Sequence, residues 1–165
     1  MFMKKTFAAT ALLIAFGAAH AGSNVIGTVE TDARVNSATQ TQSGLLNKQD
    51  ARFGSVTDSN VIGSVKTHAE INRATQRQSG LLNKQELNAG TVKGSNVIGS
   101  VETDARVNSV TQTQSGLLNK QQANIATVEG SNVIGSVKTH ASVNSLSQNQ
   151  SGLLNKQKMS IGSVD

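Results

Sequence analysis

The chain has 165 residues and a formal net charge of +5, and its four phenylalanines are its only aromatic side chains, since tryptophan, tyrosine, proline and cysteine are absent. The lack of cysteine excludes disulfides and thiolate metal sites. A mild positive charge without stacking aromatics argues against nucleic acid as a partner. The core must come from Val, Ile, Leu and Ala with closely packed polar residues, which is unusual for an enzyme and ordinary for a regular stacked structure.

Residues 1–21 have the features of a secretory signal peptide. Two lysines precede an apolar run from Phe7 to Ala19, and an Ala-x-Ala cleavage site ends at Ala21. The run is too short to span a bilayer, so membrane insertion is not expected. Cleavage after Ala21 would leave residues 22–165 and lower the net charge by the two lysines that are lost.

The remaining sequence consists of four copies of one 36-residue unit, with no insertion between them. Ser-Asn-Val-Ile-Gly marks the start of each copy, and Gln-Ser-Gly-Leu-Leu-Asn-Lys-Gln marks its middle. The copies occupy residues 22–57, 58–93, 94–129 and 130–165. A period held without a single insertion predicts that every residue, turns included, lies in a stack of equivalents.

The first half of each copy alternates with a period of two. In the first copy Val25, Val29 and Val35 share one parity, and polar residues occupy the other. This pattern is typical of a β-strand with one buried and one wet face. We therefore predict that these valines and their equivalents form the core.

The middle motif breaks the alternation and supplies Gly and Asn for a turn. After it a shorter alternation follows, with Ala51 and Phe53 expected inside and Asp50 and Arg52 expected outside. Each copy is thus predicted to be a strand, an arch and a second strand. The fold class predicted for the chain is all-β, a parallel in-register β-solenoid of cross-β type with four 36-residue coils.

Charge distinguishes a coil of 36 residues from one of 18, because neighbours in such a stack lie about 4.8 Å apart and like charges there repel. With 36 residues, two rows alternate in sign, the second when its histidines are protonated. The rows are Glu30, Lys66, Glu102 and Lys138, and Asp32, His68, Asp104 and His140. With 18 residues, Lys48, Lys66 and Lys84 would be successive neighbours. The pattern favours a coil of 36 residues. The lysines at 48, 84, 120 and 156 then form a row of like charges, which is expected to splay into solvent.

Asn and Gln recur at the same positions in every copy, for example at Gln40, Gln42 and Gln49. Identical amide side chains stacked on one another form hydrogen-bonded ladders in cross-β structures. A solvated surface needs polarity but not the same amide each time. We therefore predict amide ladders along the stack.

The ends of the stack are expected to be uncapped, which leaves backbone donors and acceptors unpaired. If the fourth copy of one molecule stacks on the first copy of the next, Lys138 meets Glu30, His140 meets Asp32, and Lys158 meets Asp50. The alternation of sign continues across this junction. Such a heterologous, non-closing contact generates filaments.

The middle motif resembles the Gln-x-Gly-x-x-Asn core of curlin repeats, the units of the secreted bacterial functional amyloid curli. The longer period is similar to the repeats of Fap fibre subunits. The resemblance implies export through an outer-membrane pore, assembly at the bacterial cell surface with a nucleator, and a role in biofilm matrix and adhesion. The matching residues are Gln42, Gly44 and Asn47; Gln78, Gly80 and Asn83; Gln114, Gly116 and Asn119; and Gln150, Gly152 and Asn155.

Catalytic chemistry is not expected, because the common nucleophile, P-loop and zinc motifs are absent from the sequence. His68 and His140 would lie two coils apart, about 9.6 Å, so we predict no metal site and no cofactor. The leading hypothesis is a secreted, self-assembling fibre subunit that grows by templated addition of coils. The alternative is a monomeric β-solenoid adhesin that binds glycan or another surface through one flat face.

Overall fold

The computed structural model describes residues 24–165 in full and residues 11–16 by their backbone. All regular structure in these ranges is β, and none of the described residues belongs to a helix that could cross a membrane. Each coil begins with a 19-residue strand and continues after an arch with a six-residue strand. The long strands are β2 (Asn24–Gln42), β5 (Asn60–Gln78), β8 (Asn96–Gln114) and β11 (Asn132–Gln150). The six-residue strands are β3 (Lys48–Phe53), β6 (Lys84–Ala89), β9 (Lys120–Ile125) and β12 (Lys156–Ile161).

A two-residue strand follows in each of the first three coils: β4 (Val56–Thr57), β7 (Val92–Lys93) and β10 (Val128–Glu129). In the fourth coil Val164 makes an isolated bridge to Val128 at the same place. The predicted strand-arch-strand unit omitted this third side. Its sequence was too short to show an alternation, although a valine recurs there in every copy.

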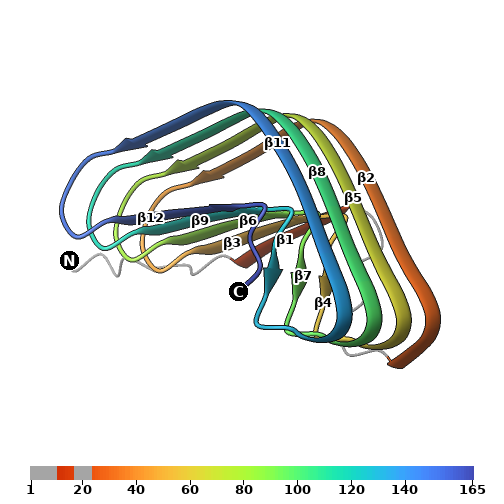
Figure 1. The fold of residues 1–165 in the computed structure, drawn as a ribbon. Helices are drawn as coiled ribbons and strands as arrows, with labels where there is room; N and C mark the ends of the chain where they lie inside the picture. The colour runs from red at the N-terminus through yellow and green to blue at the C-terminus, as the bar shows by residue number, and fades with distance from the viewer. Residues whose placement is uncertain (1–10, 17–23) are drawn as a thin grey trace, which may run out of the picture.

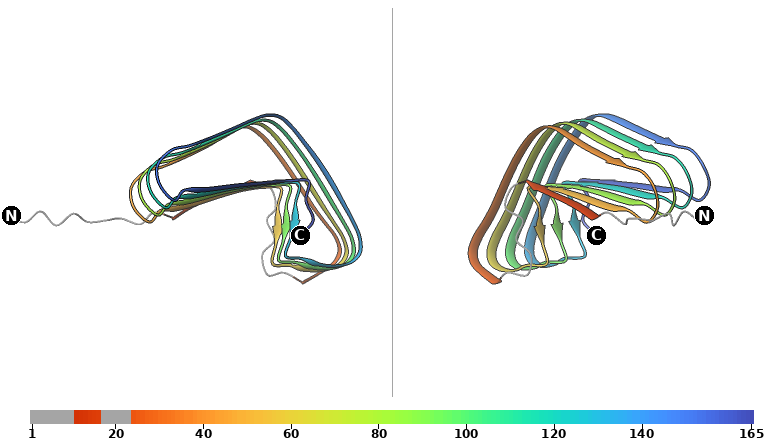
Figure 2. Two further views of the ribbon diagram at one scale, coloured as in Figure 1. Left: turned by 60° about the vertical axis from the view of Figure 1, so that its left-hand side comes forward. Right: turned by 180° about the vertical axis from the view of Figure 1, so that it is seen from behind.

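Successive coils pair in parallel and in register at a spacing of 36 residues, as in the series Asn24, Asn60, Asn96 and Asn132. The strands form three sheets, in the orders β11-β8-β5-β2, β1-β3-β6-β9-β12 and β10-β7-β4. Figures 1 and 2 show the coils stacked as near copies of one another. The predicted parallel β-solenoid with 36-residue coils is confirmed, and a coil of 18 residues is excluded.

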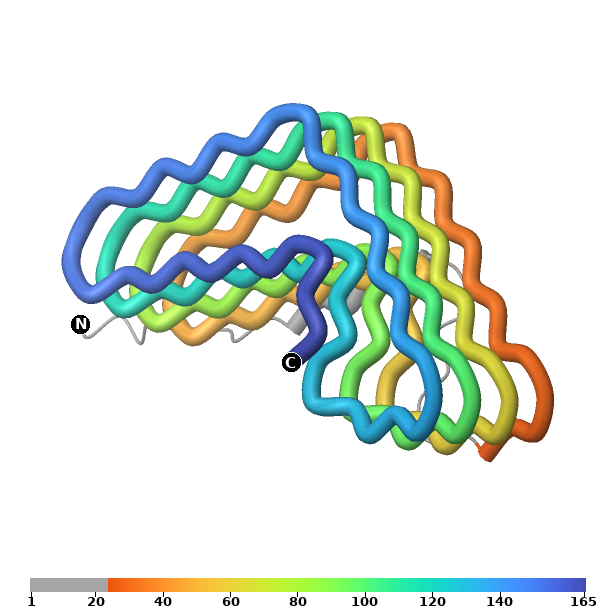
Figure 3. Tube along the Cα trace, in the orientation of Figure 1, coloured from red at the N-terminus to blue at the C-terminus, as the bar shows by residue number. Residues whose placement is uncertain are grey.

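Each coil is bent into two limbs, as the Cα trace in Figure 3 shows. At the bend the alternation of buried and exposed side chains is interrupted. In the second coil two consecutive side chains there, Asn72 and Arg73, are both exposed. Before the bend, the long strand packs against the two-residue strands; we call this part the corner limb. After the bend it packs against the six-residue strands, which we call the arch limb.

The apolar core is divided between two clusters. Valines of the corner limb form one of them, for example Val65 and Val101 against Val92. The other lies at the bend and combines alanines of the long strands with the six-residue strands. In the first coil Val29 is buried, whereas Val25 and Val35 are half-buried.

Volumes in the second cluster are matched within each of the first three coils. The second coil places Leu87 beside Ala89, and the third places Ala123 beside Ile125. Each of the first three coils therefore contributes one large and one small side chain, in either order, whereas the fourth coil, which no further coil covers, has Met159 and Ile161 at these positions. Interiors are packed so closely that a stack of flat coils requires equal volume in every layer that is covered on both sides.

This matching predicts the effect of two substitutions. Leu87→Ala leaves a cavity between two coils and is expected to lower the free energy of unfolding by about 2–5 kcal/mol. The double variant Leu87→Ala/Ala89→Ile copies the third coil and should recover most of this loss. Chemical denaturation of both variants measures the difference, and equal loss in both would show that volume is not exchanged between the two positions.

Strand β1 (Ala11–Phe16) lies inside the segment expected to be a signal peptide. It pairs in parallel with β3, from Ala11 opposite Lys48 to Phe16 opposite Phe53. One of the three sheet edges of the first coil is therefore covered in the full-length chain, whereas the expectation of an uncapped stack concerned residues 22–165. Cleavage after Ala21 would remove β1 and uncover β3.

Candidate assembly surfaces

Buried amide ladders run through the arch limb. Nε2 of Gln76 donates to Oε1 of Gln40 at 2.7 Å, and the same bond joins Gln112 to Gln76 and Gln148 to Gln112. A second ladder of 2.8–2.9 Å bonds connects Gln49, Gln85, Gln121 and Gln157. The predicted stacking of these amides is confirmed. A column of glutamines replaces apolar side chains as the core of this limb because each amide finds its partner in the next coil.

The ladder that starts at the predicted motif residue Gln42 is shorter. Nε2 of Gln78 donates to Oε1 of Gln42, and Nε2 of Gln114 to Oε1 of Gln78, both at 3.2 Å. Gln150 is exposed, and Oε1 of Gln114 has no hydrogen-bond partner within the described part of the chain. Three of the four predicted glutamines therefore form the ladder, and the fourth pairs with Gln114 only through the backbone.

Asn and Gly of the motif build the arch. Nδ2 of Asn83 donates to the Ser79 carbonyl oxygen of its own arch at 2.7 Å and to the Gly44 carbonyl oxygen of the preceding coil at 3.0 Å. Its Oδ1 accepts the Asn47 amide N–H at 2.9 Å. A Cβ on Gly80, whose φ is 105°, would collide with the Gly44 carbonyl oxygen. The motif therefore fixes the turn and joins each arch to the arch before it. The equivalents Asn119 and Asn155 make the same contacts, and Gly116 and Gly152 have similar φ values.

The ladders have a direction, because every amide donates toward the preceding coil. At the first coil, Nε2 of Gln40 and of Gln42 are buried and have no hydrogen-bond partner in the part of the chain that the structure describes. At the fourth coil, Gln148 donates to Gln112. No residue between 24 and 165 donates to Gln148 Oε1. One end of the stack thus offers amide donors, and the other offers an amide acceptor.

The apolar core is also unfinished at the fourth coil. Ile161 is 41% exposed, Leu146 46% and Val164 57%, whereas their equivalents in the third coil are 0–1% exposed. These side chains point inward, as their equivalents do, but no further coil covers them. The fourth coil therefore presents apolar surface, unpaired strand edges and a free amide acceptor together.

The predicted charge rows lie on the outer face of the corner limb. Glu30 pairs in register with Lys66, and Glu102 with both Lys66 and Lys138, yet no ion pair within 4.0 Å joins members of this row in residues 24–165. In the second row Nδ1 of His68 lies 3.4 Å from Asp104, while Asp32 and His140 are exposed. Register neighbours in the first row have opposite charges, as predicted, and His68 with Asp104 is the one pair within the two rows that is in direct contact among residues 24–165.

A charged cluster that the sequence reasoning missed lies where the six-residue strands meet the two-residue strands. Asp50 was expected to face solvent, but Asp50 and its equivalent Glu86 are each only 7% exposed. Asp50 pairs with Arg52 at 2.8 Å. Glu86 lies 3.2 Å from Lys84 and 3.3 Å from Lys93. The expected wet face is buried because the unforeseen third side folds against it. The row of lysines remains largely exposed, as predicted.

Opposing effects act on the two central charges of this cluster. Burial alone would raise the pKa of Glu86, but Lys93, Asn88 and Lys84 stabilise the carboxylate and hold its pKa below the ordinary value. Burial alone would lower the pKa of Lys93, but Glu86 and Glu129 raise it above the ordinary value. Both side chains are therefore charged at neutral pH, and each contributes stability through the other.

A lowered pKa stabilises the folded chain above the unfolded-state pKa of a glutamate, about 4.3, and that stability is lost as the pH falls through the folded value. Glu86→Gln, which copies Gln122 of the third coil, is expected to cost about 1–2 kcal/mol at pH 7, since its lysine partners are partly solvated. It should also reduce the loss of stability on acidification. Denaturation at pH 7 and pH 3 measures both effects, with the exposed Glu70→Gln as control.

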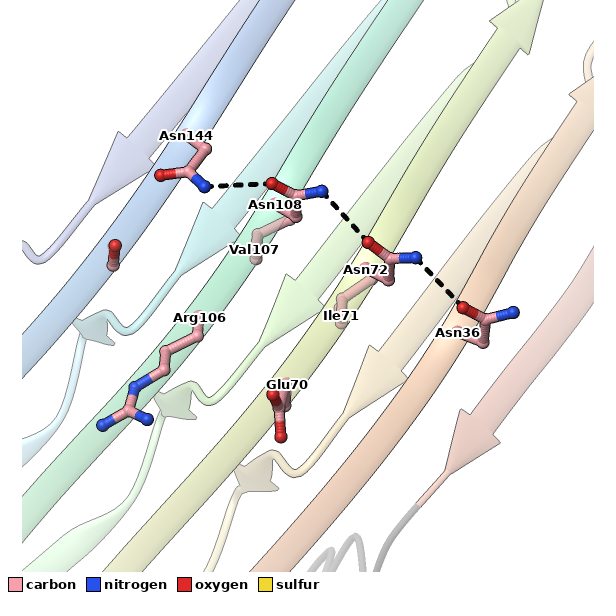
Figure 4. Close-up of a pocket in the computed structure, with 9 residues that line it drawn as sticks. Asn36, Glu70, Ile71, Asn72, Arg106, Val107, Asn108 and Asn144 are labelled. Atoms are coloured by element: carbon pink, nitrogen blue, oxygen red, sulfur yellow. Dashed lines mark hydrogen bonds between the residues drawn. The ribbon is translucent and has the colours of Figure 1, made fainter.

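An asparagine ladder runs along the bend on the outer surface (Figure 4). Asn72 donates to Asn36, Asn108 to Asn72 and Asn144 to Asn108, at 3.0–3.1 Å. The open groove beside it, of about 470 Å³, is lined by Glu70 and Arg106 among others. Within the described residues no group of three or more His, Cys, Asp or Glu side chains could hold a metal ion.

Comparisons with protein-family models, with curated proteins and with solved structures gave no match. The class of the protein therefore follows from its own geometry. It is a parallel β-solenoid whose coils are linked by backbone pairing and amide ladders.

Proposed function

We propose that the chain is the subunit of a secreted, self-assembling fibre, in which the fourth coil of one molecule stacks on the first coil of the next. The observation that carries this proposal is the pair of buried amide donors on Gln40 and Gln42, which have no hydrogen-bond partner among the described residues. Leaving a buried donor without an acceptor costs about 1–3 kcal/mol. Stacking supplies an acceptor for Gln40 from Gln148 of the neighbouring molecule, in the direction of all other bonds in that ladder.

The same junction brings together further open groups of the two ends. Lys138 meets Glu30, His140 meets Asp32 and Lys158 meets Asp50. The only like charges that become neighbours are Lys156 and Lys48, which continue the exposed row of lysines. The exposed Ile161, Leu146 and Val164 become covered by the next coil. Because the contact is heterologous and leaves a new open end, addition continues without closing. The fibre is thus an extension of the solenoid at an unchanged period of 36 residues.

The expected signal peptide has a place in this proposal. Strand β1 occupies the place on β3 that β12 of a neighbouring molecule would take, and both strands have six residues. Removal of residues 1–21 during export would uncover this edge. Secretion through an outer-membrane pore, a nucleator and a role in the bacterial surface matrix belong to the proposal through the motif resemblance. Enzymatic activity does not.

Seeded growth of residues 22–165, followed with an amyloid dye, tests the proposal. We expect a lag phase that preformed fibres abolish, and slower growth of the full-length chain because β1 covers β3. Gln40→Met should slow elongation by about five-fold, which corresponds to one hydrogen bond of about 1 kcal/mol.

Gln76→Met is the matched control, since it lies in the same ladder but inside the molecule. It should lower stability more than Gln40→Met does and slow elongation less. A chain that stays monomeric at high concentration would contradict the fibre proposal and favour the monomeric adhesin. If both variants slow elongation in proportion to the stability that they lose, the amide bond at the junction does not contribute to assembly.

A further inference from the structure

The outer face of the corner limb is a surface separate from the ends of the stack. Along this face the outward side chains form an isoleucine row followed by a Ser/Thr row and three rows of charged residues. Ile26, Ile62, Ile98 and Ile134 are 52–87% exposed, although the same residue recurs in every coil. We call this surface the outer corner face. The charged rows begin at Glu30, Asp32 and Arg34.

We propose that two molecules pair through their outer corner faces in an antiparallel, two-fold symmetric contact. The two-fold axis runs parallel to the strands. This rotation keeps the strand direction and reverses the order of the coils, so that coil one faces coil four and coil two faces coil three. Every row then faces the same row of the partner molecule.

Reversal of an alternating row of four places each charge opposite its complement. Glu30 faces Lys138 of the second molecule, and Lys66 faces Glu102. In the next row Asp32 faces His140 and His68 faces Asp104. An arrangement with the axis along the stack gives the opposite result, because it brings Glu30 onto Glu30 and sets isoleucines against arginines. Charge thus selects the antiparallel pair.

In the third row Glu70 faces Arg106 of the second molecule, and Arg34 faces Ser142. No position in the three rows meets a like charge. The four residues of the first row have no ion pair within 4.0 Å among residues 24–165, so their charges are available to a partner molecule. Facing sheets lie about 10 Å apart, a distance that Lys and Glu side chains span from opposite sides.

The isoleucine row gives the contact its apolar part. In the antiparallel pair Ile26 faces Ile134 of the second molecule and Ile62 faces Ile98, so all four isoleucines of each molecule are covered. Residues 24–35 span about 40 Å and four coils span about 19 Å, which gives a footprint of about 760 Å² on each molecule. Two such footprints approach the area of about 1,600 Å² that is typical of specific protein–protein interfaces.

Cross-linking between two single-cysteine chains tests the pairing, because the natural sequence contains no cysteine. One chain carries Ile62→Cys and the other Ile98→Cys, and a short bis-maleimide joins them, since a disulfide requires closer Cα atoms than facing sheets provide. End-to-end stacking leaves these positions at least three coils, about 14 Å, apart. We expect at least ten-fold more 62–98 product than from a control pair on the arch limb, Arg77→Cys with Thr113→Cys.

A charge variant separates pairing from stacking. Lys66→Glu places two like-charged pairs across the interface and should lower the 62–98 yield about ten-fold, whereas Lys66→Glu/Glu102→Lys restores opposite charges and should restore the yield. Both variants create the same number of like-charged neighbours within the stack, and neither alters the end junction. Equal yields from the two variants, or a wild-type yield no higher than that of the arch-limb control, would overturn the pairing even if fibres form.

Discussion

Parallel pairing of each residue with its own copy 36 positions away is the constraint on which the rest of the structure depends. In such a stack every side chain lies about 4.8 Å above its equivalent. An amide gains a hydrogen bond to its equivalent in this arrangement, whereas a charged side chain is repelled by an equivalent of the same sign. Apolar side chains must together fill the same volume in each layer. The glutamine columns, the alternating charges and the matched pair of Leu87 and Ala89 are three consequences of one geometry.

The composition of the chain follows from the same constraint. Proline would remove a backbone donor from a ladder, and a large aromatic side chain that appears in one coil needs a small neighbour to keep the layer flat. Phe53, the only aromatic side chain in residues 24–165, sits beside Ala51 in this way. Amide side chains in the ladders all donate toward the preceding coil, which makes the two ends of the stack different and complementary.

Growth at the ends and contact at the outer corner face use separate surfaces.

Much of the fold could be predicted because repetition makes long-range pairing visible in the sequence. The 36-residue register, the Val alternation and the amide ladders all follow from comparing one copy with the next. The bend at Asn72 and Arg73 and the third side at Val92 could not be found in this way, since neither changes the period. Their consequence, the burial of Glu86 among lysines, depends on how one coil folds upon itself. Pairing of β1 with β3 was missed because residues 11–16 resemble no part of the repeat.

The central claim is that the 36-residue coil continues unbroken across molecular boundaries. Mass per unit length, combined with fibre diffraction from assembled residues 22–165, measures this most directly. The account predicts a meridional reflection near 4.8 Å and about 36 residues per 4.8 Å of each filament, or twice that for paired filaments. A value near 18, or the absence of the 4.8 Å reflection along the fibre axis, would contradict it.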